Sequence, residues 1–137
     1  MTQFSCLQLS QAQGIATVTL NLPDKRNALS LVMMRELTLA FAQIAAGDAR
    51  GVILAANGPV FSAGHNFADM AGADAAHLQQ LFAACTDMMN SLQHMPQPVL
   101  ARVHALATAA GCQLVATCDL VIASEQAAFA LPGGKGS

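Results

Sequence analysis

The sequence predicts a single α/β domain, and three observations support that prediction. Short β-prone runs alternate along the chain with longer segments whose apolar residues recur at helical spacing. No internal repeat, linker or low-complexity segment interrupts this alternation. Apolar residues make up 54% of the 137 residues and charged residues only 10%, so much of the chain must be buried around a core. One domain at 1–137 is therefore expected.

The first half is expected to hold a hairpin, a helix and a buried strand. The hairpin joins strands at 7–9 and 15–20, and the second strand alternates as a half-buried strand does. Ser30 is a suitable N-cap for a helix that Gly47 ends. The all-apolar run 51–56 suits a strand that is buried on both faces.

The second half is expected to add two helices separated by a strand. Asp74 can cap the first helix and Pro96 closes it. The strand covers 98–103, and Thr108 can cap the second helix at 109–117. The remaining expected segments are two strands and a polar loop, at 119–123, 127–131 and 21–27.

Charge and composition argue against several kinds of partner. The formal net charge is −2 and there is no basic stripe, so a nucleic acid is not expected. The most apolar stretch, 98–123, is interrupted by polar and charged residues and is not expected to span a membrane. The four cysteines show no CxxC pair and no zinc-type spacing, so buried free thiols and no metal are expected. The first residues lack a signal-peptide pattern, which makes the cytoplasm the expected location.

The segment 109–113 could present backbone N–H groups to a ligand. The first turn of a helix has N–H groups without intrahelical partners, and the macrodipole makes that end partly positive. Small residues at Ala109, Ala110 and Gly111 would let a carbonyl oxygen approach closely. One donor to such an oxygen, as it gains negative charge, typically lowers a barrier by about 2.7–4 kcal/mol. The alternative is that the small residues only pack this helix tightly against a strand.

A second candidate lies at 61–66, directly after an apolar strand. Gly64 permits a sharp turn that could expose the N–H of His65. The alternative is a loop histidine that faces solvent. Neither a hydrolase built on Ser62 nor a metal site at His65 is favoured, because the glycine of a nucleophile elbow is absent and the neighbouring residues are poor ligands.

These segments occur together and in order in the crotonase superfamily of enoyl-CoA hydratases and isomerases, which the chain resembles over essentially all its length. Residues 23–30 (PDKRNALS) resemble the family's P-x-x-x-N-A-L/M-[ST] loop, and residues 61–66 (FSAGHN) resemble its F-[SC]-A-G-x-D loop. Residues 102–114 and 118–120 are similar to its V-x-G-x-A-x-G-G-G-x-E-L…C-D signature. Residues 129–133 resemble its F-x-x-P-E strand end.

The resemblance implies a crotonase-like ββα spiral core, truncated before the C-terminal strands and helices, and an acyl-CoA ligand of fatty acid metabolism. It assigns catalytic positions to His65 and Ala110, whose N–H groups would form an oxyanion hole for the thioester carbonyl, and to Gln113. Coenzyme A would enter as part of the thioester substrate, with no other cofactor and no metal. The residues that the resemblance assigns to coenzyme A binding are Lys25, Arg26, Ala28, Ala63, Gly64 and His65.

The chain departs from the family at both usual catalytic carboxylates. Hydratase members have one glutamate where this chain has Gln113 and another where it has Gly133. Paired carboxylates let one group activate water while the other delivers a proton, and neither replacement can do this. Hydratase activity is therefore not expected from this chain. The residues that could stand in for proton transfer are His65, Asp69 and Lys135.

Three interpretations stay open at this stage. The chain could be an enzyme that acts on acyl-CoA thioesters, a non-catalytic acyl-CoA-binding protein, or an inactive fragment of a longer reading frame. The sequence ends after a strand with no closing helix, which favours the third because the last strands would have an uncovered edge. Family members assemble as trimers or hexamers through C-terminal helices that are missing from this sequence, so the resemblance gives no expectation of the oligomeric state here.

Overall fold

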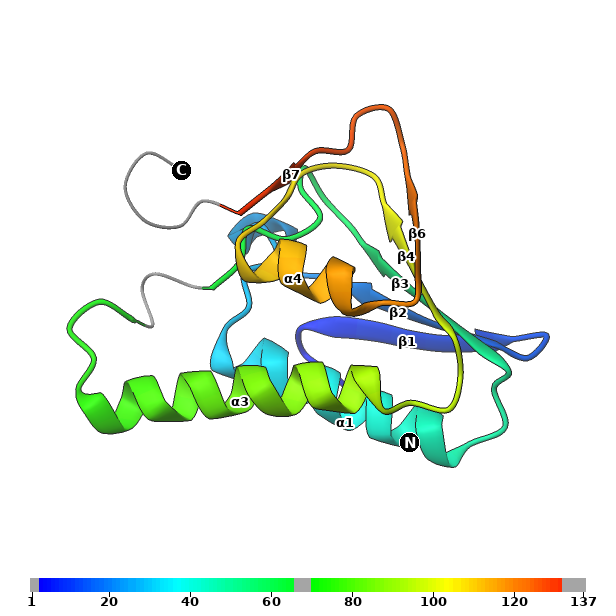
Figure 1. Ribbon diagram of the computed structural model, residues 1–137, viewed down its shortest axis with the longest axis horizontal. Coiled ribbons are helices and arrows are strands. Elements are labelled where there is room, and N and C mark those ends of the chain that lie inside the picture. Colours follow the sequence, from blue (N-terminus) through cyan, green and yellow to red (C-terminus); the bar gives the residue numbers. More distant parts are fainter. Residues whose placement is uncertain (1–2, 66–69, 132–137) are drawn as a thin grey trace.

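The computed structural model describes residues 3–65 and 70–131, and it shows a mixed α/β arrangement in which helices cover one face of a sheet (Figure 1). The main sheet has five strands in the order β1-β2-β3-β4-β6; β1 is antiparallel to β2 and the other neighbours are parallel. A smaller parallel sheet pairs β5 with β7. The strands are β1 (Leu7–Ala12), β2 (Ile15–Leu20), β3 (Gly51–Ala56), β4 (Val99–Val103), β5 (Ala107–Thr108), β6 (Leu120–Ala123) and β7 (Phe129–Ala130). The predicted α/β class is confirmed.

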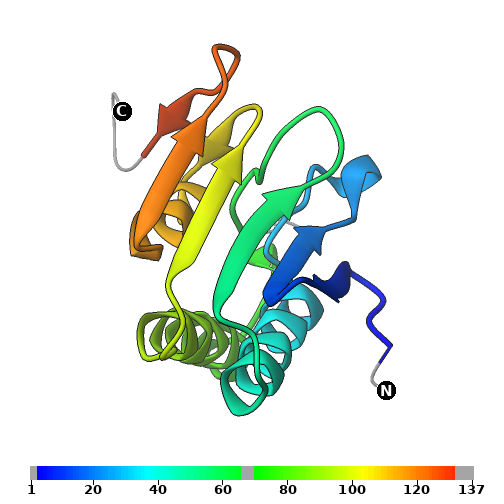
Figure 2. The ribbon, with the colours of Figure 1, turned by 90° about the vertical axis from the view of Figure 1, so that its right-hand side faces the viewer.

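Two long helices run side by side against the sheet, and a short one lies between them and the ends of the strands (Figures 1 and 2). The long helices are α1 (Leu31–Ala46) and α3 (Ala75–Gln93). The short helix is α4 (Ala110–Thr117), and a 3-10 turn, η1 (Pro23–Lys25), follows β2.

Local capping explains where the long helices begin. The Ser30 hydroxyl accepts a hydrogen bond from the Met33 N–H at 3.1 Å, and the Asp74 carboxylate accepts one from the His77 N–H at 2.8 Å. Each cap satisfies an N–H group that the first turn leaves free. Both predicted caps are therefore confirmed.

The predicted cap at Thr108 is wrong. Thr108 lies in β5, where it pairs with β7, and its N–H donates to the Ser62 carbonyl at 3.0 Å. The N-cap of α4 is Ala109, with no side-chain cap hydrogen bond. A strand pairing between residues distant in sequence thus overrides the local capping preference of threonine.

Other boundaries also differ from the predictions. The strand expected at 127–131 is limited to Phe129–Ala130, because only these residues pair with β5. The loop expected at 21–27 contains η1, in which the fixed φ of Pro23 favours a turn and the Arg26 N–H closes it on the Pro23 carbonyl at 3.0 Å.

The core lies between the sheet and the helices. Ala16, Val18 and Leu20 of β2 are fully buried, as the alternation predicts, while the intervening residues face outward. Full burial of a large apolar side chain contributes about 1.5–3 kcal/mol each. The largest fully buried side chains are Phe41, Phe61, Leu20, Leu29, Met33, Met34, Leu37, Leu54, Met88 and Leu114.

The strand β6 lies at one edge of the main sheet (Figure 2). Its residues Leu120, Val121 and Ile122 are 63%, 45% and 59% exposed. Within the described residues no strand pairs with its outer edge. Such an apolar edge is a template for association with another strand.

A carboxylate on α1 holds the segment that precedes β1. Glu36 accepts hydrogen bonds from the Ser5 N–H at 2.9 Å, the Ser5 hydroxyl at 2.7 Å and the Cys6 N–H at 2.8 Å. Burial alone would raise the pKa of Glu36, but these hydrogen bonds outweigh burial and hold the pKa below its ordinary value of 4.5.

We predict that Glu36→Gln lowers the free energy of unfolding by about 1 kcal/mol at pH 7, because the ionised acceptor is lost at a partly solvated site. A carboxyl group whose pKa is lowered by folding stabilises the protein above its unfolded pKa and loses that effect as the pH falls through the folded pKa. The difference from wild type should therefore shrink as the pH falls below 4.5 and vanish once the pH lies below the folded pKa. Urea denaturation across this pH range checks the prediction, with the exposed Glu125→Gln as control. A difference that persists in acid would contradict it.

Candidate functional site

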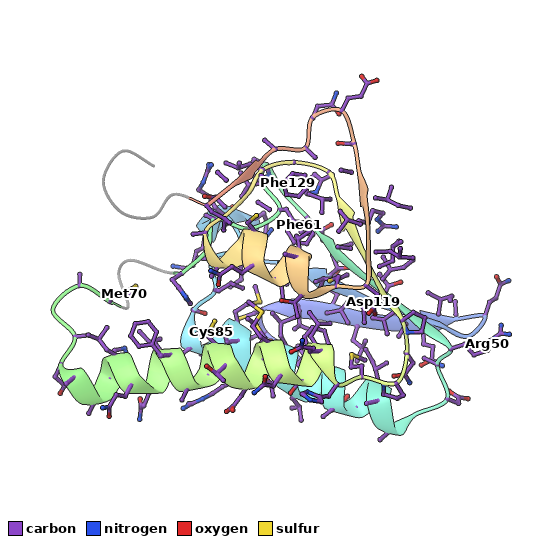
Figure 3. All side chains as sticks on the ribbon, viewed as in Figure 1. Arg50, Phe61, Met70, Cys85, Asp119 and Phe129 are labelled. Carbon is purple, nitrogen blue, oxygen red and sulfur yellow. The ribbon has the colours of Figure 1, made fainter. Side chains whose placement is uncertain are left out.

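The candidate site lies where the loops after three neighbouring strands meet. β2, β3, β4 and β6 are parallel, so their carboxyl ends share one edge of the sheet, where ligands of open parallel sheets commonly bind. Figure 3 shows Phe61 and Phe129 at this end of the molecule and Arg50, which precedes β3, at the opposite end.

Asn27 joins the loop after β2 to the loop after β3. It is fully buried, its side-chain oxygen accepts from the Leu22 N–H at 2.8 Å, and its amide donates to the Asn57 carbonyl at 2.7 Å. Its φ of 50° lies in the left-handed region, which asparagine adopts more readily than most residues. Asn27 therefore fixes both the local turn and the distance to the next loop.

Ser62 continues this connection to the loop that carries Gly64. Its hydroxyl donates to the Asn27 carbonyl at 2.8 Å and accepts from the Gly64 N–H at 3.2 Å. Ser62 is fully buried, so its hydroxyl is part of the protein interior and not a surface nucleophile. This burial agrees with the weak sequence support for a serine hydrolase.

Gly64 brings the loop into contact with the start of α4. A Cβ added to Gly64 would lie 3.0 Å from the Ala109 Cβ, 3.0 Å from the Thr108 carbonyl oxygen and 3.3 Å from the Ala110 nitrogen. Its φ of +85° is also one that other residues rarely adopt. The two predicted N–H segments, separated by more than forty residues in sequence, are thus direct neighbours.

Hydrogen bonds fix the direction of the His65 N–H. In a planar trans peptide unit the carbonyl and the following N–H point in opposite directions. The Gly64 carbonyl accepts from the Leu29 N–H at 2.6 Å, which orients the His65 N–H away from Leu29. His65 is half-buried.

A hydrogen bond on the preceding carbonyl also orients the Ala110 N–H. The Ala109 carbonyl accepts from the Gln113 N–H at 3.1 Å, so the Ala110 N–H points out of the N-terminus of α4. The Ala109 N–H donates to the Ala130 carbonyl at 2.8 Å, which ties this turn to β7. Ala109 has φ 54° and ψ −124°, a conformation that is strained for a residue with a side chain.

The N–H groups of His65 and Ala110 donate no hydrogen bond to any residue within 3–65 or 70–131. Two adjacent, oriented donors of this kind can stabilise negative charge on an oxygen atom. The partly positive end of a helix adds to the effect at Ala110. The arrangement can therefore polarise a carbonyl group.

Three of the residues predicted to bind coenzyme A, Lys25, Arg26 and Ala28, lie in the loop next to the one that carries Gly64. The Arg26 carbonyl accepts a hydrogen bond from the Ala63 N–H at 3.0 Å. The loop that contains Lys25 and Arg26, the basic loop, therefore adjoins the loop of Gly64. The side chains of Lys25 and Arg26 are exposed, and Ala28 is half-buried.

Of the three candidates for proton transfer, His65 lies at the described site, whereas Asp69 and Lys135 lie outside the described residues. Gln113 lies on α4 with an exposed side chain. Two residues of the motifs that resemble the family, Asn66 at the end of 61–66 and Gly133 at the end of 129–133, also lie outside the described residues.

Burial makes three of the four cysteine thiols poor nucleophiles. All four are free, Cys6 is buried and the other three are partly buried. Burial raises the pKa of Cys6 and Cys85, and burial together with the Asp119 carboxylate raises that of Cys118 to about 12. The described residues include no group of three metal-ligating side chains, and none of their helices has the length and apolar character that a membrane crossing requires.

Comparison with known families identifies the domain. The model of the enoyl-CoA hydratase/isomerase family matches residues 10–135, which include every segment of the candidate site. The chain belongs to the enoyl-CoA hydratase/isomerase family. The fold and the family resemblance expected from the sequence are thereby confirmed.

Members of this family from several organisms are similar to the chain. A zebrafish (Danio rerio) protein named enoyl-CoA hydratase domain-containing protein 3, mitochondrial, is 44% identical over 94% of this chain and 46% of its own length. A probable enoyl-CoA hydratase of Rhodobacter capsulatus is 35% identical over 86% of this chain and 46% of its own length. The chain thus spans about half the length of the curated relatives it matches.

Solved structures of the enoyl-CoA hydratase/isomerase family share the fold. An enoyl-CoA hydratase of Mycobacterium smegmatis superposes with a TM-score of 0.88 at 46% identity, covering 91% of this chain and 50% of that one. Human enoyl coenzyme A hydratase domain-containing protein 3 superposes with a TM-score of 0.90 at 38% identity, covering 93% and 51%. The truncated spiral core expected from the resemblance agrees with this half coverage.

The expected cytoplasmic location is wrong. Relatives from zebrafish, rat and human that are 42–44% identical are named as mitochondrial proteins. The expectation depended on the lack of a secretory signal pattern, which does not distinguish the cytoplasm from an organelle.

Sequence reasoning missed the roles of Asn27 and Ser62. A polar residue between apolar and small neighbours, as at Ser62, is the signal that could have identified a buried hydrogen-bonding group. Its partner Asn27 lies 35 residues away, and no local pattern connects the two.

We predict opposite effects for two exchanges in the first turn of α4. Ala109→Gly should stabilise the protein by about 1 kcal/mol, because glycine relieves the strained backbone at a cost in unfolded-state entropy. Gly111→Ala should destabilise it despite alanine's better helix propensity, since the added Cβ would lie 2.7 Å from the Cβ and carbonyl oxygen of Ser62. Urea denaturation measures both effects. Stabilisation by Gly111→Ala would contradict the close packing of Gly111 against Ser62.

Proposed function

We propose that this chain binds acyl-CoA thioesters and stabilises negative charge on the thioester carbonyl oxygen with the N–H groups of His65 and Ala110. The observation that carries the proposal is the contact between Gly64 and the start of α4, which makes these two N–H groups neighbours. The names of the relatives, which include enoyl-CoA hydratase, support coenzyme A thioesters as the ligand class.

In this proposal both donors act through preorganised backbone. Each peptide unit is held by a hydrogen bond on its carbonyl side, from Leu29 in one case and from Gln113 in the other. Neither unit has to turn when charge develops on the ligand oxygen, and such preorganisation is what makes oxyanion stabilisation effective. The site needs no side chain for this step.

The basic loop supplies the proposed contact with the coenzyme A phosphates. Lys25 and Arg26 are exposed next to the loop of Gly64, in a chain whose net charge is −2. Their attraction for phosphate groups should weaken as salt concentration increases. Ala63 and Ala28 would border the bound ligand through their backbone and methyl groups. Coenzyme A is the carrier part of the ligand in this proposal.

We assign no proton-transfer residue. The glutamine side chain of Gln113 does not exchange protons near neutral pH, and it is exposed on α4. The expectation that the chain lacks hydratase activity stays a prediction.

Two substitutions at Ala110 test the role of its backbone. Ala110 is the first residue of α4, so proline at this position removes the N–H without breaking an intrahelical hydrogen bond. Ala110→Pro should abolish binding of a short acyl-CoA, since it removes the donor, whereas Ala110→Gly should leave binding nearly unchanged. Isothermal titration calorimetry measures both, after circular dichroism has established that each variant is folded.

Two outcomes would count against the proposal. If folded wild-type protein gave no heat of binding at millimolar acyl-CoA, the ligand class would be wrong. If the glycine and proline variants lost binding equally, the segment would act through packing alone.

A further inference from the structure

Ser62 contacts both of the segments that carry the proposed donors. On one side its hydroxyl accepts from the N–H of Gly64, the residue before His65. On the other side its carbonyl accepts from the Thr108 N–H at 3.0 Å, two residues before Ala110. Because Ser62 is fully buried, it has little freedom to move relative to either segment.

The first turn of α4 also packs directly on Ser62. A Cβ added to Gly111 would lie 2.7 Å from the Ser62 Cβ and 2.8 Å from its hydroxyl oxygen, so only a glycine fits against it. Ser62 therefore contacts Gly64, which precedes His65 in sequence, and Gly111, which follows Ala110.

The Ser62 hydroxyl is itself held in one orientation. It donates to the Asn27 carbonyl at 2.8 Å, which leaves its lone pairs for the Gly64 N–H. The neighbouring N–H of Ala63 donates to the Arg26 carbonyl, so the loop is attached at successive residues. Removal of the hydroxyl would leave a buried carbonyl and a buried N–H without partners, and the loop would shift to satisfy them.

We propose that Ser62 is a positioning residue that sets the separation and direction of the His65 and Ala110 N–H groups, and so determines recognition of the thioester carbonyl. This inference rests on the proposed function. The inference goes beyond the proposed function, because it assigns the selectivity for acylated over free coenzyme A to a buried side chain that does not touch the ligand.

The inference predicts a selective loss. Free coenzyme A lacks the thioester carbonyl but keeps the phosphates and the adenine. Ser62→Ala should therefore weaken binding of a short acyl-CoA about tenfold while binding of free coenzyme A stays unchanged. A purely structural role for Ser62 would weaken both ligands together.

The experiment is calorimetry of wild type, Ser62→Ala and Ser62→Cys with butyryl-CoA and with free coenzyme A. Isotope-edited infrared spectroscopy of the bound ligand, labelled with carbon-13 at its carbonyl, reports carbonyl polarisation directly. Wild type should shift the carbonyl stretch to lower frequency, Ser62→Ala should reduce the shift, and Ser62→Cys should give an intermediate value. Glu36→Gln is the matched control, because it removes hydrogen bonds elsewhere in the fold and should leave both readouts unchanged.

The outcomes separate this inference from the proposed function. If wild type binds butyryl-CoA more tightly than coenzyme A and Ser62→Ala keeps that preference and the infrared shift, the positioning role is overturned and the proposed function stands. If wild type shows neither binding nor preference, both are overturned. If Ser62→Ala does not fold, Ser62→Cys decides, and an unchanged preference in that variant overturns the inference.

Discussion

The buried hydrogen bond between the Ser62 hydroxyl and the Asn27 carbonyl is the interaction on which the candidate site depends. It joins the loop after β2 to the loop after β3, and the carbonyl of Ser62 extends the connection to β5. Asn27 and Ser62 are both fully buried, so the loss of either partner would leave a buried polar group without a hydrogen bond. The backbone donors on either side can therefore remain fixed although they lie on loops.

The elements around the candidate site differ in how deeply they are buried. The loops of the candidate site are attached to parallel strands whose inner faces are buried. By contrast, β6 and β7 are exposed, and β7 holds Ala109 through a single backbone hydrogen bond from the Ala109 N–H to the Ala130 carbonyl. The position of Ala109, and with it the donor on α4, therefore depends in part on a hydrogen bond to an exposed strand.

Interactions that are local in sequence could be predicted, and those between distant segments could not. Ser30 and Asp74 cap helices through N–H groups three residues away, so propensity alone located both. Thr108 has the same local preference, but pairing with β7 more than twenty residues later places it in a strand. Helix-end chemistry and the family resemblance identified the segments of His65 and Ala110, whereas their contact through Gly64 required the folded chain.

The central claim is that the N–H groups of His65 and Ala110 together receive the thioester carbonyl. The most direct measurement is the chemical shift of these two amide protons by nuclear magnetic resonance during titration with a short acyl-CoA and, separately, with free coenzyme A. The account predicts that both resonances move downfield together with the acyl-CoA, because a stronger hydrogen bond deshields the proton, and stay in place with free coenzyme A. Binding of the acyl-CoA that leaves both amide resonances unmoved would contradict it.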